Sequence, residues 1–358
     1  MTKWLITLVP LTLTLALEYL APEQPLWIFA ASGLAIVPLA GWMGQATEEL
    51  AARGGEGVGG LLNATFGNAA ELIIAIAALR LGLHDVVKAS LAGSIVGNIL
   101  LVLGAAMLGG GVRHRPAQSF NAHAAGSQAT MLTLAAIALI IPAAFQRVLG
   151  PSAAPVAFLS VSISIVLLAL YGANLLFSLV THRALFEGSR VEGEVEHAAS
   201  WSLRRSLAVL GAATVAIAWT SEILVAAIEP TAHALGLTDA FVGVFVVAIL
   251  GNAAEHATAI TAAMKNRMDL SLTIAIGSSV QISLLVAPFL VLLSYAIAPT
   301  PMDLAFNGGL VLTVVVSVWV VGQVAADGRS DWLKGVQLLA LYLVLGLAFF
   351  YAPAPAPP

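Results

Sequence analysis

The sequence contains no cysteine among its 358 residues, which excludes disulfide frameworks, thiolate metal sites and cysteine catalysis. Charge is also scarce. Only 9% of the residues are Asp, Glu, Lys or Arg, against about 25% in soluble domains. Hydrophobic residues make up 59% of the chain, and the mean hydropathy is +0.96. Because the net charge is −4 and no basic stripe is present, nucleic acid is not an expected partner. The composition predicts an integral membrane protein in a lipid bilayer.

The apolar runs are long and continuous, unlike the alternating strands of a membrane barrel. A helix needs roughly 20 apolar residues to cross a bilayer, so we expect eleven spans. They cover residues 4–20, 26–44, 61–80, 85–109, 128–146, 154–181, 203–228, 237–264, 270–297, 304–325 and 333–352. The first run is kept as a span because Glu18 and Pro22 occupy the place of a signal-peptide cleavage site.

Lysine and arginine are distributed unevenly over the expected loops. If the N-terminus is cytoplasmic, twelve of the fifteen lie inside, and only Arg80, Lys88 and Arg147 lie outside. Cytoplasmic loops carry an excess of these residues. We therefore expect a cytoplasmic N-terminus and an outer C-terminus. Short loops without targeting extensions favour a prokaryotic cell membrane, with an organelle membrane as the alternative.

One motif occurs twice. Gly67-Asn-Ala-Ala-Glu71 recurs 184 residues later as Gly251-Asn-Ala-Ala-Glu255, and residues 67–102 share 15 identities in 36 positions with residues 251–286. The first copy starts in an outward-running span and the second in an inward-running one, so the copies are inverted. Inverted repeats place a substrate site near the bilayer midplane and permit alternating access around it.

The expected fold is therefore an all-α membrane protein with two inverted five-helix repeats, spans 2–6 and spans 7–11. The predicted parts are an extra N-terminal helix (1–25), the first repeat (26–181), an acidic cytoplasmic linker (182–202), the second repeat (203–352) and a disordered tail (353–358). The linker either attracts cations or is simply solvated. Its acidic residues are Glu187, Glu192, Glu194 and Glu196.

Two carboxylates, Glu71 and Glu255, are expected in mid-membrane at equivalent positions. A charge at that depth costs about 2.5–3.5 kcal/mol, and two facing carboxylates repel unless a cation or protons lie between them. Asn68 and Asn252 each precede a glutamate by three residues, so each pair shares a helix face. The pattern favours a cation site that protonation can empty.

Further oxygen donors accompany the two glutamates. A helix break at Gly67 and Gly251 would free backbone carbonyls as ligands. The following spans contribute Ser94, Asn98, Ser278, Ser279 and Gln281. Such ligands favour Ca²⁺, Mg²⁺, Mn²⁺ or Na⁺ over Zn²⁺ or Cu⁺. The alternative is that the Asn and Ser side chains hydrogen-bond between helices and that each glutamate is a protonated packing residue.

These motifs resemble a known family. Gly60-Leu-Leu-Asn-Ala-Thr-Phe-Gly-Asn-Ala-Ala-Glu71, Gly251-Asn-Ala-Ala-Glu-His256 and Gly277-Ser-Ser-Val-Gln281 are similar to the alpha-repeat motifs of the cation/proton exchangers (CAX) of the Ca²⁺/cation antiporter superfamily. The resemblance implies Ca²⁺/H⁺ antiport without a cofactor, with Glu71 and Glu255 as principal ligands. It also implies an ion path lined by Asn68, Asn252, Ser94, Ser278 and Gln281. The chain lacks a long N-terminal regulatory extension, so autoinhibition of that kind is not expected.

Other residues leave alternatives open. His256 either relays protons or makes an interhelical hydrogen bond. Glu222 and Glu229 are seven residues apart, on one face near the outer end of their span, where they act as a gate or are simply solvated. Other functions are a Na⁺-coupled or Mn²⁺ exchanger, a passive channel or an intramembrane metal-dependent enzyme. We expect no enzyme, since the sequence has neither an HExxH nor a GxSxG motif.

Overall fold

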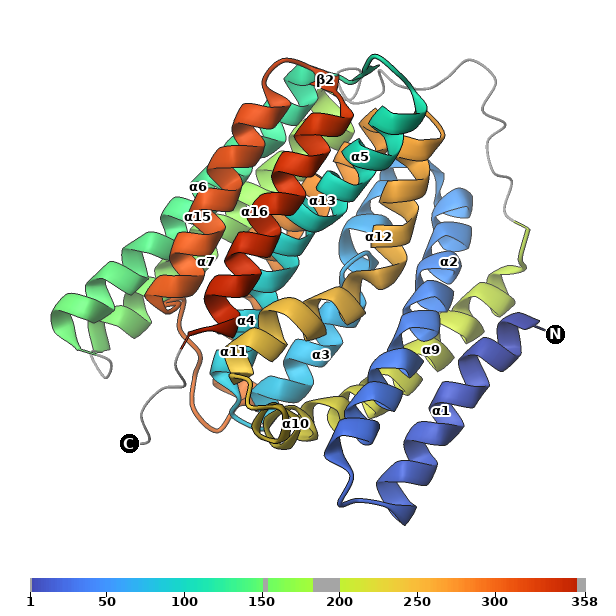
Figure 1. Cartoon of the computed structure of the whole chain (residues 1–358), viewed down its shortest axis with the longest axis vertical. Helices are drawn as coiled ribbons and strands as arrows, with labels where there is room; N and C mark the ends of the chain where they lie inside the picture. The colour runs from blue at the N-terminus through green and yellow to red at the C-terminus, as the bar shows by residue number, and fades with distance from the viewer. Residues whose placement is uncertain (1, 151–153, 183–199, 353–358) are drawn as a thin grey trace. The chain divides into compact units, whose positions relative to one another are not determined.

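The computed structural model describes residues 2–150, 154–182 and 200–352, and almost all of its regular structure is helical (Figure 1). The acidic residues of the expected linker and the expected tail lie outside these ranges. The helices before the linker are α1 Thr2–Leu20, α2 Pro25–Phe66, α3 Ala69–Arg80, α4 His84–Val96, η1 Gly97–Val102, α5 Leu103–Arg113, α6 Ala122–Leu149, α7 Ala154–Leu176 and η2 Phe177–Thr181. Those after it are α9 Leu203–Ala226, α10 Ile228–Leu235, α11 Asp239–Val242, η3 Gly243–Val247, α12 Ala248–Met264, α13 Met268–Gln281, η4 Ile282–Val286, α14 Ala287–Ile297, α15 Gly308–Ala325 and α16 Trp332–Phe350. The segments labelled η are π-helical turns.

Nine helical stretches in the described part of the chain are long and apolar enough to cross a membrane. The expected count of eleven is therefore not confirmed. The N-terminal run contributes only a shorter apolar stretch, Ile6–Leu20, and α3 has 12 residues. Large apolar side chains lie exposed on the helices, for example Phe158 at 75% and Leu343 at 65%, which is the surface that lipid chains would cover.

The prediction was wrong about the loop expected between residues 44 and 61, because α2 runs through it without interruption. Residues 54–60 include five glycines but no proline. A glycine costs a helix about 1 kcal/mol but leaves its hydrogen bonds intact. The chain turns instead at Gly67–Asn68, where Asn68 has φ −102° and ψ 26° and α3 begins. The break expected at Gly67 is thus present, whereas α12 continues through Gly251.

After the motif itself, the two copies of the repeat have matching secondary structure. Adding 184 to the bounds of α5, Leu103–Arg113, gives those of α14, Ala287–Ile297. A π-helical turn precedes each of these helices, η1 in the first copy and η4 in the second. The sequence does not predict these turns, which leave one backbone carbonyl out of the usual ladder and are frequent at functional sites.

The chain forms two compact units, and each unit takes segments from both repeats. The described residues of the first unit lie within 2–90, 200–254 and 349–352. Its helix α2 lies beside α1 (Figure 1) and packs against α9, which also packs against α3. The shared core consists of Leu39, Ala40, Met43, Ala69, Ala70, Ala213 and Ile217. The small residues in it bring three helix backbones close together.

The second unit comprises described residues within 91–150, 154–182 and 255–348. Helix α6 packs along α15 (Figure 1) and against α13, while α14 packs against α7. A two-residue ribbon, β1 Gln118–Ser119 and β2 Arg329–Ser330, is the exception to the all-helical fold. The Gln118 Nε2 donates to the Ala263 carbonyl and to Asn266 Oδ1, both at 2.9 Å. These bonds fix the end of α12 to the loop before α6.

Helices α5 and α16 meet at two glycines, and this contact yields a stability prediction. A Cβ added at Gly335 would overlap Leu108 N and lie 2.6 Å from the Gly104 carbonyl oxygen. Backbone atoms cannot move aside as side chains can. We expect Gly335→Ala to destabilise the protein by about 1–3 kcal/mol, measured as a lower Tm in detergent. Gly322→Ala in α15 is the control, since its Cβ would meet nothing within 4 Å. Equal Tm values for both variants would contradict the close contact.

Candidate functional site

The first of the two predicted glutamates, Glu71, lies in the first turn of α3, immediately after the Gly67–Asn68 break, and is 6% exposed. A helix start presents unpaired N–H groups and a partial positive charge, both of which favour a carboxylate. Asn68, at the N-cap position of α3 but without a side-chain capping bond, is also buried. The break therefore places Glu71 where the backbone itself stabilises negative charge.

Gly251 of the second motif packs against Glu71 within the first unit. A Cβ on Gly251 would lie 3.2 Å from Glu71 Cγ, 3.6 Å from Cδ and 3.7 Å from Oε1. The missing side chain makes room for the glutamate. Its neighbour Asn252 is 1% exposed and donates from Nδ2 to the Ala248 carbonyl at 3.0 Å. The second motif thus places a glycine against the glutamate of the first, although the expected break at Gly251 is not present.

In the second unit, Glu255 belongs to a hydrogen-bonded network. His256 Nε2 lies 3.0 Å from Asn98 Oδ1, and Asn98 Nδ2 donates to Ser278 Oγ at 3.2 Å. Ser278 in turn donates to the Glu255 carboxylate. Because the Asn98 amide nitrogen faces Ser278, its oxygen accepts from His256, which therefore carries a proton on Nε2. All donors point toward the carboxylate. His256 makes the interhelical hydrogen bond that was one of its two expected roles.

The Glu255 carboxylate is only partly satisfied. Its Oε2 atom is buried and has no hydrogen-bond partner within the described part of the chain. A buried acceptor without a donor costs about 1–3 kcal/mol. Such an atom is stabilised by a cation or by its own proton.

The remaining predicted path residues have different environments. Ser94 and Ser278 are buried at equivalent positions of α4 and α13, at 2% and 5% exposure. Ser279 donates to the carbonyls of Ala275 and Ile95 at 3.1 and 3.3 Å, so it holds two helices together. Gln281 is partly buried at the end of α13. Within the described residues, no group of three or more His, Cys, Asp or Glu side chains is arranged to hold a metal ion. Cation ligands would therefore include amide, hydroxyl or carbonyl oxygens beside the glutamates.

One polar residue near the second motif was missed by the sequence reasoning. The Gln128 Nε2 lies 3.7 Å from where a Cβ of Gly277 would be. Gln128 comes from α6, which carries no copy of the motif. No sequence signal connects it to the repeat.

Glu222 and Glu229 do not share a helix face as expected. Helix α9 ends at Ala226, and α10 begins at Ile228, so a turn at Ala227 separates the two glutamates. Seven-residue spacing predicts a common face only in an uninterrupted helix. Glu222 forms an ion pair with Arg80 Nη1 at 2.8 Å, while Glu229 is exposed on α10.

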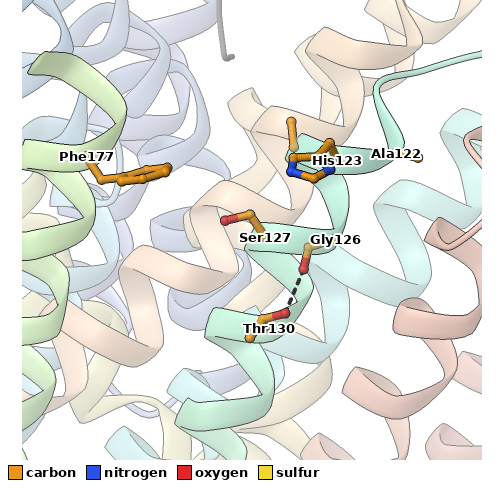
Figure 2. Close-up of a pocket in the computed structure, with 7 residues that line it drawn as sticks. Ala122, His123, Gly126, Ser127, Thr130 and Phe177 are labelled. Carbon is orange, nitrogen blue, oxygen red and sulfur yellow. Dashed lines mark hydrogen bonds between the residues drawn. The ribbon is translucent and has the colours of Figure 1, made fainter. Parts of the chain in front are cut away.

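A hollow of about 400 Å³ lies beside the start of α6 (Figure 2). Its lining residues are Ala122, His123, Ala124, Gly126, Ser127, Thr130 and Phe177. Thr130 Oγ1 donates to the Gly126 carbonyl at 2.9 Å. Phe177, on η2, lines the hollow from the other side. No carboxylate is among the residues that line it, so this hollow does not offer the ligands expected of a divalent cation site.

Comparison with known proteins places these features in a family. Residues 24–180 and 205–351 each match the family described as sodium/calcium exchanger protein. The chain is similar to the Ca²⁺/H⁺ antiporter of Aphanothece halophytica, with 46% identity covering 91% of this chain and 90% of the relative. It is 44% identical to the Ca²⁺/H⁺ antiporter of Synechocystis sp., covering 91% of each chain. The solved structure of native YfkE superposes with a TM-score of 0.84 and 38% identity, covering 98% of this chain and all of that one.

The network around Glu255 yields a second prediction. Asn98→Leu keeps the side-chain size but leaves the His256 N–H and Ser278 Oγ without this partner. We expect a loss of about 1–3 kcal/mol in stability, measured by thermal unfolding in detergent. Ser283→Ala is the control, because that hydroxyl donates only to carbonyls of its own helix, at 2.8 and 3.1 Å. A Tm for Asn98→Leu as high as that of the control would show that the network does not hold the helices.

Proposed function

This chain belongs to the sodium/calcium exchanger protein family, as its repeated motifs indicated, and we propose that it is an antiporter that exports cytoplasmic Ca²⁺ in exchange for H⁺. The family consists of transporters, and the helical chain is a multi-pass membrane protein. The two curated relatives are named Ca²⁺/H⁺ antiporters, which supports protons as the coupling ion rather than Na⁺.

The observation that carries the proposal is a glutamate in each repeat whose surroundings suit a bound cation. Glu71 lies at a helix start against bare Gly251. The Glu255 carboxylate accepts a hydrogen bond from Ser278, and its Oε2 atom is buried without a donor among the described residues. Gly251 comes four residues before Glu255 in the same motif. The packing of Glu71 on this glycine therefore supports a shared role for the two motifs.

Exchange follows from the chemistry of these carboxylates. In the ionised form they attract Ca²⁺, and Asn68, Asn252, Ser94, Ser278, Gln281 and backbone carbonyls supply the further oxygens that this ion requires. Protonation removes the charge and releases the ion. The protonated site is neutral, so it can return without crossing the bilayer as a charge. Alternating access then exposes the same carboxylates to the cytoplasm and to the outside in turn.

The orientation of the chain completes the proposal. The excess of Lys and Arg on one set of loops supports a cytoplasmic N-terminus and an outer C-terminus. With this orientation the linker of residues 182–202 lies in the cytoplasm. The cyanobacterial relatives support a prokaryotic cell membrane as its location.

Loss of either carboxylate charge tests the assignment of the site. We expect Glu71→Gln and Glu255→Gln each to abolish Ca²⁺ exchange, because an amide keeps the size but neither ionises nor binds protons in this range. The measurement is ⁴⁵Ca²⁺ counterflow in proteoliposomes, with the Tm in detergent as a check on folding. Glu23→Gln, in the exposed turn between α1 and α2, is the control. Normal counterflow in either site variant would rule that glutamate out as a ligand.

The coupling ion is tested with imposed gradients. Proteoliposomes with an acidic interior should accumulate ⁴⁵Ca²⁺, and a protonophore should abolish the uptake. Uptake that requires a Na⁺ gradient instead would make the protein a sodium-coupled exchanger with the same site. Mn²⁺ competition in the same assay measures ion preference. Single-channel currents without coupling would contradict antiport altogether.

A further inference from the structure

The start of α9 is fastened to α2 by a half-buried polar cluster in the first unit. Glu49 accepts a hydrogen bond from Ser200 Oγ, and its second oxygen accepts one from Trp201 N at 2.9 Å. Arg53 donates to the Trp201 carbonyl. The Trp201 side chain is 6% exposed, and the Arg205 guanidinium carbon lies 4.4 Å from its ring centroid. The hydrogen bonds of Glu49 and Arg53 thus hold Ser200 and Trp201 on α2, and we call these bonds the Trp201 anchor, while Arg205 of α9 covers the tryptophan ring.

The other end of α9 is fastened to α3 by a different kind of contact. Arg80, the last residue of α3, pairs with Glu222 at 2.8 Å, and the two side chains are 60% and 54% exposed. An exposed ion pair contributes about 0–1 kcal/mol. This pair is therefore easily opened, whereas the Trp201 anchor combines several hydrogen bonds around one buried side chain.

The chain break at Gly67–Asn68 lies between the two fastenings. Helix α9 packs against both α2 and α3 (Figure 1), and so it bridges the break from one side to the other. A glycine-containing break is a place where backbone dihedrals can change and a helix can hinge. If the chain hinges there, α2 stays with α9 through the Trp201 anchor, and α3 is the part that shifts.

The contact between α3 and α9 suits such a shift. Its core residues on α3 are Ala69 and Ala70, and on α9 they include Ala213. Ile217 on α9 also belongs to this core, and Ile73 on α3 packs against it, but the alanines leave few bulky side chains between the two helices for a shift to displace. Glu71 follows directly on α3, which means that any movement of α3 against α9 carries this carboxylate with it.

We propose that the Arg80–Glu222 ion pair is a latch that opens and closes once in every exchange cycle, while the Trp201 anchor stays closed throughout. This inference rests on the proposed exchange function, because it assigns the latch to the movement of Glu71 between its two accessible states. The latch positions the carboxylate through α3 and does not bind the transported ion.

The natural absence of cysteine makes the proposal directly testable. Two double variants are prepared, Arg80→Cys with Glu222→Cys across the latch, and Glu49→Cys with Ser200→Cys across the anchor. Each is treated in proteoliposomes with a short bifunctional methanethiosulfonate reagent, and ⁴⁵Ca²⁺ uptake is measured before and after reduction. We expect the crosslinked latch variant to lose uptake and to recover it on reduction. The crosslinked anchor variant should keep its uptake. The four single-cysteine variants with the same reagent are the controls.

Two results would overturn the proposal. If the crosslinked latch variant transports as fast as the same variant after reduction of the crosslink, positions 80 and 222 do not separate during exchange. A crosslinked anchor that stops transport would show that α2 and α9 part from each other. If the unmodified protein moves no Ca²⁺ at all, the proposed function fails. Spin labels at positions 80 and 222 then test the latch independently, and one unchanging distance across pH and Ca²⁺ concentrations would refute it.

A charge swap separates the latch from a purely structural role. We expect Arg80→Glu to change the exchange rate by about two- to fivefold, the range that an exposed ion pair contributes. The additional change Glu222→Arg should restore the rate by rebuilding the pair in reverse. A double variant no better than the single one would indicate that the ion pair itself has no part in exchange.

Discussion

The helices of this protein are apolar almost throughout, so a polar group inside them depends on partners that the chain itself provides. The two glutamates are the strongest case. Glu71 is placed at a helix start against a residue without a side chain, and Glu255 is reached by the hydroxyl of Ser278. Both arrangements come from elements of the repeat, and both place a carboxyl group among apolar helices.

The two halves of the chain share the positions of their helices but differ in the polar residues around the two glutamates. Helices α5 and α14 have equivalent bounds, and each follows a π-helical turn. Asn98, which bridges His256 and Ser278, is equivalent to Ile282, and His256 is equivalent to Leu72. The hydrogen-bonded network around Glu255 therefore has no counterpart of the same composition at Glu71. The two copies of the repeat thus supply two similar carboxylates in two unlike surroundings.

The sequence predicted what depends on local composition and repetition. Apolar runs located most of the helices, the repeated motif located both glutamates, and Gly67 marked a true break. It failed where the outcome depends on tertiary packing. The glycine run in 54–60 stays helical within α2, Gly251 makes room for Glu71 in place of a break, and Ala227 interrupts the face expected for Glu222 and Glu229. The Gln128 and Trp201 contacts join segments with no shared pattern. They emerge only once the chain is folded.

The order of donors around Glu255 has a consequence for proton traffic. A proton moves along a chain of hydrogen bonds only if each member can accept one proton and release another. Hydroxyls and imidazoles do this readily, but the amide of Asn98, which stands between His256 and Ser278, keeps its two N–H hydrogens and has no acidic proton to pass on. The network therefore holds the helices together but does not conduct protons between His256 and Ser278. In the exchange proposed above, a proton therefore does not pass between His256 and Glu255 through Asn98 and Ser278, although the two residues are neighbours in the sequence.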